Sequence, residues 1–129
     1  VLDLKQKNRV EEKHYVLVET IKDIIKKNYN RSNLYVDEIA SILKMSPKYI
    51  GRIFKENTGM TISEYITDVR ISIAADLLKN TELSVTDISL DVGIENDTYF
   101  YSLFKKKYGT TPKEYAVKFF TEKSETAIK

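Results

Sequence analysis

The chain has 129 residues, 42% of them hydrophobic, and its 21 basic and 19 acidic side chains give a formal net charge of +2 at pH 7. It has no cysteine, which excludes a disulfide framework and a thiolate metal site, and no apolar run or leader-like segment indicates a membrane span or a signal peptide. With two prolines and four glycines an all-β fold is disfavoured, and we expect an all-α, cytoplasmic protein built as one domain or two small subdomains.

The N-terminal part of the chain is predicted to form two helices after a flexible lead-in at residues 1–9. The first helix is expected over residues 10–29, because apolar residues recur there at helical spacing. These residues are Val10, Leu17, Ile21, Ile24 and Ile25. The second helix is expected over residues 36–43, where Tyr35 is a poor N-cap residue.

A third helix is predicted over residues 47–57, after a turn at Lys44-Met45. Ser46 supplies a capping oxygen, Pro47 fits the first helical turn, and Gly59 is a typical helix end. One face of this helix is apolar and the other is basic. The apolar residues are Ile50, Ile53 and Phe54, and the basic ones are Lys48, Arg52 and Lys55.

A long connecting helix follows, within residues 61–80. Thr61 and Glu64 have the spacing of a capping box, and Asn80 lies near the predicted end. The residues placed on its inner face are Ile62, Tyr65, Ile66, Val69, Ile73, Ala74, Leu77 and Leu78.

The last part of the chain repeats these signals. Ser84 with Asp87, and Asn96, mark helix starts, while Gly93 and Gly109 mark helix ends. The predicted helices cover residues 85–92, 97–107 and 112–120, and residues 121–129 are expected to be a flexible tail.

The repeat is also visible in the residues themselves. The segment FKENTGMTISEY, from Phe54 to Tyr65, returns as FKKKYGTTPKEY, from Phe104 to Tyr115, with one residue inserted near Glu95. Each copy is a short helix, a turn and a second helix with a cationic outer face, which describes a helix-turn-helix. The sequence therefore predicts about seven helices, in two helix-turn-helix subdomains at residues 10–60 and 81–120, joined by the connecting helix.

Charges are unevenly distributed along the chain. Residues 44–55 carry four bases and no acid, and residues 105–107 are three consecutive lysines. Residues 82–97 carry five acids and no base. Bases on the second helix of each copy favour contact with nucleic acid, because that helix enters the major groove in a helix-turn-helix.

The sequence offers no constellation of residues for catalysis or for binding a metal or a cofactor. His14 is the only histidine, and its position suits packing or partial exposure. The acids at residues 11–12 and 37–38 lie near helix starts, where the helix dipole accounts for them. We therefore predict that the chain is not an enzyme.

Two residues of the third helix have alternative interpretations. Arg52 can bond the O6 and N7 atoms of guanine together, or it can form an ion pair with Glu56. Gly51 lies inside a helix, where glycine costs about 1 kcal/mol relative to alanine. It indicates either a close approach of the helix backbone to DNA or a tolerated residue.

The stretch from Val36 to Tyr115 resembles the DNA-binding domain of the AraC/XylS family of bacterial transcription regulators. The resemblance rests on Ile39-Ala40, the twofold FK-x3-G-x-T signature, Ala74 with Leu77-Leu78, Val92-Gly93, Tyr99-Phe100 and Thr111-Pro112. It implies two helix-turn-helix subdomains that bind successive major grooves on one face of the duplex. A connecting helix of about 18 residues would be roughly 27 Å long, comparable with the ~34 Å of one DNA turn.

The resemblance also implies which residues contact DNA. The base-reading positions fall on Lys48, Gly51 and Arg52 in the first copy, and on Asp97, Thr98, Tyr101 and Ser102 in the second. The phosphate contacts are expected at Lys44, Ser46, Lys55, Asn96, Lys105 and Lys106. Ser102 and Ala116 stand where the family often has a basic residue, Ile94 replaces a common phenylalanine, and Asp97 adds a negative charge. These departures predict weaker sequence reading by the second copy.

The expected function is sequence-specific binding of double-stranded DNA in the regulation of transcription, with RNA polymerase as a further partner. The alternative is an α-helical protein-interaction module that docks to RNA polymerase, for example, without reading DNA. The chain begins with Val1, and we expect it to be a fragment of a longer protein that carries an effector or receiver domain.

Overall fold

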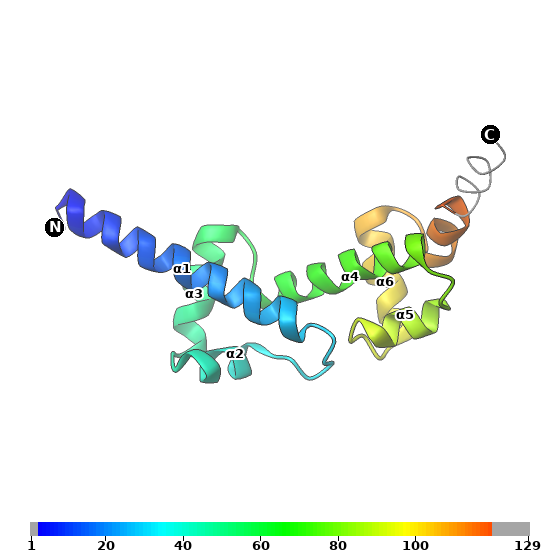
Figure 1. The fold of residues 1–129 in the computed structure, drawn as a ribbon, viewed down its shortest axis with the longest axis horizontal. Helices are drawn as coiled ribbons and strands as arrows, with labels where there is room; N and C mark the ends of the chain where they lie inside the picture. Colours follow the sequence, from blue (N-terminus) through cyan, green and yellow to red (C-terminus); the bar gives the residue numbers. More distant parts are fainter. Residues whose placement is uncertain (1–2, 120–129) are drawn as a thin grey trace. The chain divides into compact units, whose positions relative to one another are not determined.

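The computed structural model describes residues 3–119, and this part is helical without a strand (Figure 1). Six helices have the bounds α1 Leu4–Asn28, α2 Val36–Leu43, α3 Pro47–Thr58, α4 Ile62–Asn80, α5 Val85–Asp91 and α6 Asp97–Tyr108. A seventh helical segment covers residues 112–119. The predicted all-α fold with seven helices is thereby confirmed. The predicted helix end at residue 120 and the tail at 121–129 lie outside the described residues.

The chain divides into two compact units. Unit 1 comprises the residues up to Tyr29 together with Asn33–Thr67. Unit 2 comprises Asn30–Ser32 together with the chain from Asp68 onward. The division falls inside α4, so this helix contributes its first turns to unit 1 and its remaining turns to unit 2.

Helix α1 begins at Leu4 rather than near residue 10, so the predicted lead-in is wrong for residues 4–9. Asp3 accepts a hydrogen bond from the Gln6 backbone N–H at 2.8 Å, and the Gln6 side chain accepts one from the Asp3 backbone. This capping box satisfies free N–H groups at the helix start. Val10 is 38% exposed, so the buried face of α1 begins only at Leu17.

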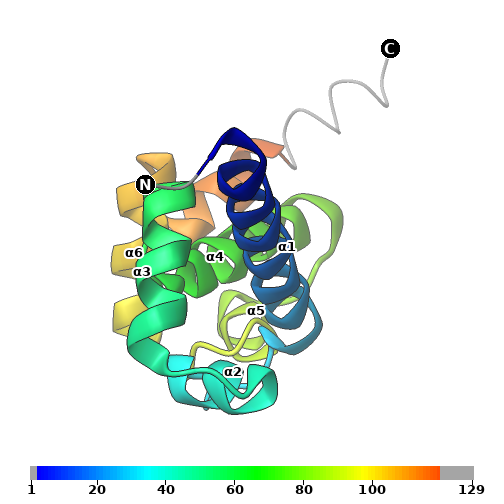
Figure 2. The ribbon, with the colours of Figure 1, turned by 90° about the vertical axis from the view of Figure 1, so that its left-hand side faces the viewer.

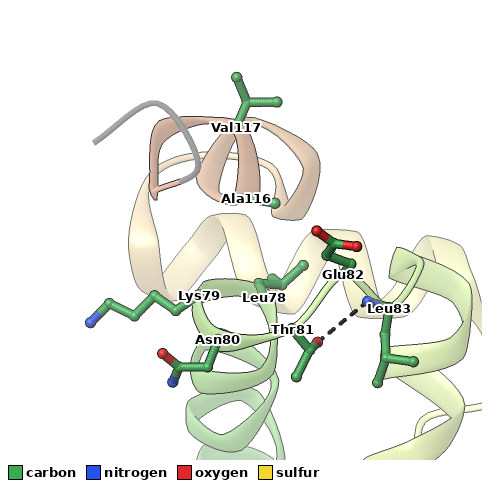
Figure 3. A pocket seen from close by; sticks show the side chains of 8 residues that line it. All are labelled: Leu78, Lys79, Asn80, Thr81, Glu82, Leu83, Ala116 and Val117. Atoms are coloured by element: carbon green, nitrogen blue, oxygen red, sulfur yellow. Dashed lines mark hydrogen bonds between the residues drawn. The ribbon is translucent and has the colours of Figure 1, made fainter. Parts of the chain in front are cut away.

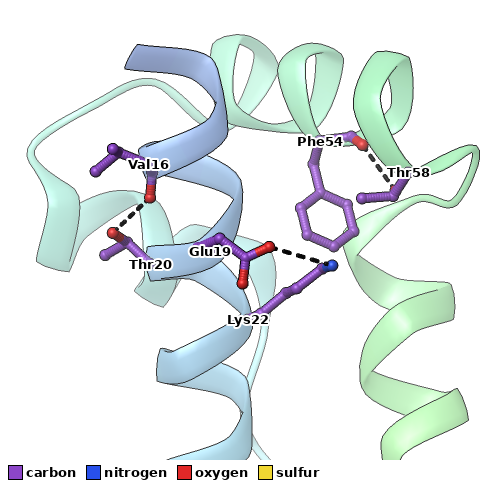
Figure 4. Close-up of polar contacts among 6 residues, drawn as sticks. All are labelled: Val16, Glu19, Thr20, Lys22, Phe54 and Thr58. Carbon is purple, nitrogen blue, oxygen red and sulfur yellow. Dashed lines mark hydrogen bonds and ion pairs between the residues drawn. The ribbon is translucent and has the colours of Figure 1, made fainter. Parts of the chain in front are cut away.

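The core of unit 1 lies where α1 and α2 pack on α3 (Figure 2). Its fully buried residues include Ile21, Ile25, Ile39, Ile50, Ile53 and Phe54. Figure 4 shows Phe54 between α3 and the side chain of Lys22, which forms an ion pair with Glu19 at 3.6 Å. The Phe54 ring also meets Tyr65 of α4 edge to face, at 5.4 Å between ring centres. These contacts fix the apolar face of α3 and leave its basic face outward.

The turn between α2 and α3 depends on a lysine in an unusual conformation. Lys44 has φ 56°, in the left-handed region, and its backbone N–H bonds back to Ser41 O at 3.2 Å. The corresponding position in unit 2 is Gly93, with φ 89°. Glycine adopts this conformation without a steric penalty, whereas a residue with a Cβ does not.

The helix boundaries around α3 follow the local signals in the sequence. Ser46 Oγ accepts a hydrogen bond from the Tyr49 N–H at 3.1 Å, and Pro47 occupies the first turn. Gly59 ends α3 with φ 78°. Tyr35 makes no side-chain capping bond to α2, as its size predicts.

The core of unit 2 is an aromatic and aliphatic cluster around α6. Phe104 is fully buried. The centre of its ring lies 4.8 Å from the centre of the Tyr108 ring and 5.3 Å from the centre of the Tyr115 ring. Phe100, also fully buried, continues the cluster at 6.0 Å from Phe104. Because Tyr115 belongs to residues 112–119, this cluster ties the last described helical segment to α6.

The turn between α5 and α6 is stabilised by one buried and one exposed hydrogen bond. Ser89 is fully buried, and its hydroxyl donates to Ile94 O at 2.5 Å. Glu95, which lies near the inserted residue, is exposed and accepts a hydrogen bond from Ser32 Oγ at 2.9 Å. Asn96 then caps α6 by accepting from the Tyr99 N–H at 2.8 Å. This turn therefore presents the start of α6 in a defined geometry.

Candidate nucleic-acid interface

The outer face of α3 carries the predicted contact residues of unit 1. Lys48, Arg52 and Lys55 are all exposed, and their spacing of four and three residues places them along one side of the helix. Ser46 and Lys44 are exposed just before the helix start. The structure therefore brings the predicted residues of unit 1 onto one surface, at the N-terminal end and outer side of α3.

Arg52 already has partners in the free protein. Its Nη1 lies 3.3 Å from Glu56 Oε1, so the ion pair considered as an alternative is present. Its guanidinium also lies over the ring of Tyr49, at 5.6 Å from the ring centre. Both side chains of the ion pair are 56% exposed. An exposed pair of this spacing contributes only about 0.3–0.5 kcal/mol, so it leaves Arg52 available to a stronger partner.

Gly51 leaves open space beside α3. Apart from its two chain neighbours and the backbone of its own helix, no atom lies within 4 Å of the place that a Cβ would take. Packing inside unit 1 therefore does not require glycine here.

Helix α6 presents the corresponding residues of unit 2 with different chemistry. Thr98, Ser102 and Lys105 are exposed and share the spacing of Lys48, Arg52 and Lys55. Tyr101 is 37% exposed and lies edge to face with Phe100, at 6.4 Å between ring centres. Thr86 Oγ1 donates to Asp97 Oδ2 at 3.4 Å, which orients one predicted contact residue toward α5. The outer face of α6 therefore offers hydroxyl groups at two of the three positions where α3 offers cations, and a lysine at the third.

The three consecutive lysines at the end of α6 have different environments. Lys105 and Lys106 are exposed. Lys107 Nζ donates to Asp68 Oδ1 and to Ser72 Oγ, each at 2.6 Å. Lys107, which is exposed as well, thus connects α6 to α4 within unit 2.

Sequence reasoning missed two features of the site. One is the contact of Arg52 with the Tyr49 ring, for which the spacing of three residues on a helix is a usable signal. The contact of Lys107 with Asp68 joins residues 39 apart, and no local pattern indicates it.

Other parts of the described chain offer little for catalysis. Among these residues no group of three or more His, Asp or Glu side chains is placed to hold a metal ion. His14 is half-buried on α1. Burial raises the pKa of Tyr115 above its usual value, with contributions from Tyr108 and Asp76, so this tyrosine stays protonated at neutral pH. None of the described helices combines the length and apolar character that crossing a bilayer requires.

A hollow of about 450 Å³ lies in unit 2, between the end of α4, the residues that follow it and the segment 112–119 (Figure 3). Its lining includes Leu78, Ala116 and Val117, with Lys79 and Glu82 as its charged residues. One acid and one base with aliphatic neighbours do not make a reaction centre.

Comparisons with known proteins agree with this geometry. A family model described as a helix-turn-helix domain matches residues 39–117. The bifunctional transcriptional activator/DNA repair enzyme AdaA of Bacillus subtilis is 41% identical over 95 residues, which are 74% of this chain and 44% of that protein. The chain thus spans less than half the length of the curated relatives that it matches.

Two solved structures are also similar. The C-terminal domain of AraT, a response regulator from Geobacillus stearothermophilus, matches with a TM-score of 0.76 and 32% identity, over 79% of this chain and 84% of that chain. The C-terminal domain of the two-component response regulator yesN from Fusobacterium nucleatum matches with a TM-score of 0.72 and 36% identity, over 76% of this chain and 95% of that chain.

Proposed function

Because the chain belongs to the helix-turn-helix family of AraC-type DNA-binding domains, we propose that it binds double-stranded DNA sequence-specifically and regulates transcription. The observation that carries this proposal is the outer face of α3. Its exposed residues Lys48, Arg52 and Lys55 lie along one side of the helix, and its apolar face is buried in the core. A recognition helix needs this arrangement, because its inner face must be anchored while its outer face reaches base edges and phosphates. We further propose that α3 and α6 enter successive major grooves.

We assign two kinds of contact to the exposed residues. Base edges are read by Lys48, Gly51 and Arg52 in unit 1, and by Thr98, Tyr101 and Ser102 in unit 2. Phosphates are bound by Lys44, Ser46, Lys55, Asn96, Lys105 and Lys106. Backbone N–H groups at capped helix starts and exposed lysines are common phosphate ligands, which supports this division.

The whole protein has further proposed partners. Exposed acids lie on α5 and in the turns beside it, and they support docking to a basic surface of a partner, for which we propose RNA polymerase. The acids are Glu82, Asp87, Asp91, Glu95 and Asp97. This chain spans less than half the length of these relatives, which supports the proposal that the whole protein has an effector or receiver domain. We propose that the protein acts in the cytoplasm without catalysing a reaction, although AdaA is named as a DNA repair enzyme as well as an activator.

The affinity for DNA is expected to fall steeply with salt. Phosphate contacts release counterions, and four lysine contacts give a slope of about 3–4 log units of affinity per log unit of salt. Fluorescence anisotropy with a labelled duplex over a range of potassium chloride concentrations measures this slope. A slope below about two would show that Lys44, Lys55, Lys105 and Lys106 are not phosphate ligands. No binding at any salt concentration would favour the protein-interaction module.

Gly51→Ala is expected to stabilise the free protein and to weaken its binding to DNA. Alanine stabilises a helix interior by about 1 kcal/mol relative to glycine, and the space beside Gly51 can accommodate its Cβ. The same methyl group would separate the α3 backbone from base edges. Urea denaturation measures the first effect, and titration of a selected duplex measures the second. Unchanged affinity with raised stability would mean that glycine is merely tolerated at this position.

A further inference from the structure

The first turns of α1 carry three bases along one side of the helix. Lys5, Arg9 and Lys13 follow one another at a spacing of four residues, which places them side by side on the helix surface. All three are exposed, and none of them forms an ion pair with another described residue. We call these three residues the α1 stripe. Its charges are available to an anion outside the protein.

The same turns of α1 do not pack in the core of unit 1. The buried face of the helix begins at Leu17, four turns after the helix start. Val10, Tyr15 and Val16 are exposed, and at about 100° per residue they point in three different directions around the helix. Scattered apolar residues of this kind do not form a face for a protein partner. The feature that these turns present in order is therefore the α1 stripe.

The α1 stripe faces the start of α3. Helix α1 runs beside α3 in unit 1 (Figure 2). Arg9 and Lys13 line a hollow that is also lined by Met45, in the turn before α3, and by Tyr49, in its first turn. Glu12 lines the hollow as well, so its charge offsets only part of that of the two bases. The phosphate ligands proposed for the turn between α2 and α3 are exposed at this same end of α3.

We propose that the α1 stripe binds the phosphate backbone of DNA beside the half-site of unit 1, as a third contact in addition to α3 and α6. This inference rests on the proposed function of α3. A recognition helix places its N-terminal residues at base edges, so the strands that border the groove pass close to the elements beside its start. Lysine and arginine bind phosphates without reading the sequence. The stripe therefore raises the affinity for every duplex alike.

Salt titrations of single variants test the proposal. The probes are a duplex recovered from a random pool by the unaltered chain and a scrambled duplex of the same length and composition. Arg9→Gln, Lys13→Gln and the pair of substitutions remove charge from the stripe, and glutamine has a helix propensity similar to that of lysine and arginine. Lys7→Gln is the matched control, because Lys7 is exposed two residues from Arg9 and so lies on the other side of α1. Circular dichroism checks that each variant is folded.

Each single variant of the stripe is expected to lower the slope by about 0.9 log units of affinity per log unit of salt, and the pair by about 1.8, for both duplexes. Ethylation interference on the selected duplex locates the contact. The pair of substitutions should lose sensitive phosphates beside one half-site, the one in which Arg52→Ala relaxes base preference. Lys7→Gln should change neither the slope nor the interference pattern.

Three results would overturn the proposal. An unaltered slope in the pair of substitutions would exclude phosphate contact by the stripe. Equal falls for Lys7→Gln and Arg9→Gln, or a fall in slope without a change in the interference pattern, would show only long-range attraction. If the unaltered chain binds neither probe, the proposed function itself fails.

Discussion

Arg52→Ala is expected to relax base preference in one half of the DNA site while leaving the other half unchanged. A bidentate contact between arginine and guanine discriminates by about 1–3 kcal/mol, and alanine cannot replace either bond. Site selection from a random duplex pool, carried out with the unaltered chain and with the variant, measures the loss position by position. We expect the guanine preference at one position in the half-site of unit 1 to disappear.

Two matched variants separate base reading from general affinity. Ser102→Ala changes the equivalent position of α6 and is expected to alter the selected sequence little, because serine contacts bases less specifically than arginine does. Lys106→Ala should weaken selected and scrambled duplexes about equally, since an exposed lysine supplies phosphate affinity without sequence information. If Arg52→Ala weakened both kinds of duplex by the same factor, Arg52 would be a phosphate ligand rather than a base reader. Two half-sites of equal sharpness would contradict the predicted inequality of the units.

Phe104→Ala is expected to lower the free energy of unfolding by about 3–5 kcal/mol, which is a large part of the stability of a small protein. Phe104 is fully buried, and its removal would leave a cavity among Phe100, Tyr108 and Tyr115. Urea denaturation followed by circular dichroism measures the loss. Val117→Ala is the control, because Val117 is 58% exposed and its truncation should change stability by less than about 0.5 kcal/mol. A loss below about 1 kcal/mol for Phe104→Ala would mean that the aromatic cluster does not hold unit 2 together.

The helix boundaries could be predicted where a single local interaction determines them. Ser46, Asn96, Gly59 and Gly109 act within one turn of the chain, and each occupies its predicted boundary. Asp3 gives the same kind of signal, because its spacing from Gln6 marks the start of α1. Apolar periodicity does not mark this start, because it begins only where α1 meets the core.

The predicted bounds of α4 agree with the structure, but the residues predicted for its inner face agree only in part. Ile71 and Ala75 are buried, although the apolar spacing placed neither on the inner face, while Ile73 is only half-buried. The helix serves two cores in succession, so its buried side is not one straight stripe. A single period fitted along the helix cannot describe such a change of partner.

The candidate site shows the same division between local and distant information. The outward direction of Lys48 and Arg52 follows from the buried Ile50, Ile53 and Phe54 on the opposite face, and the sequence contains that pattern. The tie from Lys107 to Asp68 depends on how α6 packs on α4, which residue types and spacing do not encode. The roles of individual residues toward DNA stay predictions until the variants described above are measured.

The left-handed lysine at the turn before α3 has a consequence for protein engineering. A residue with a Cβ lowers the stability of the folded chain by about 1–2 kcal/mol in this conformation, and the equivalent turn of unit 2 avoids this cost with Gly93. Lys44→Gly would therefore be a first choice for a thermostable version of the domain. The same substitution would remove a cation at the edge of the proposed contact surface. Stabilisation is better sought at Thr110, whose buried hydroxyl has no hydrogen-bond partner among the described residues and which valine could replace at nearly equal volume.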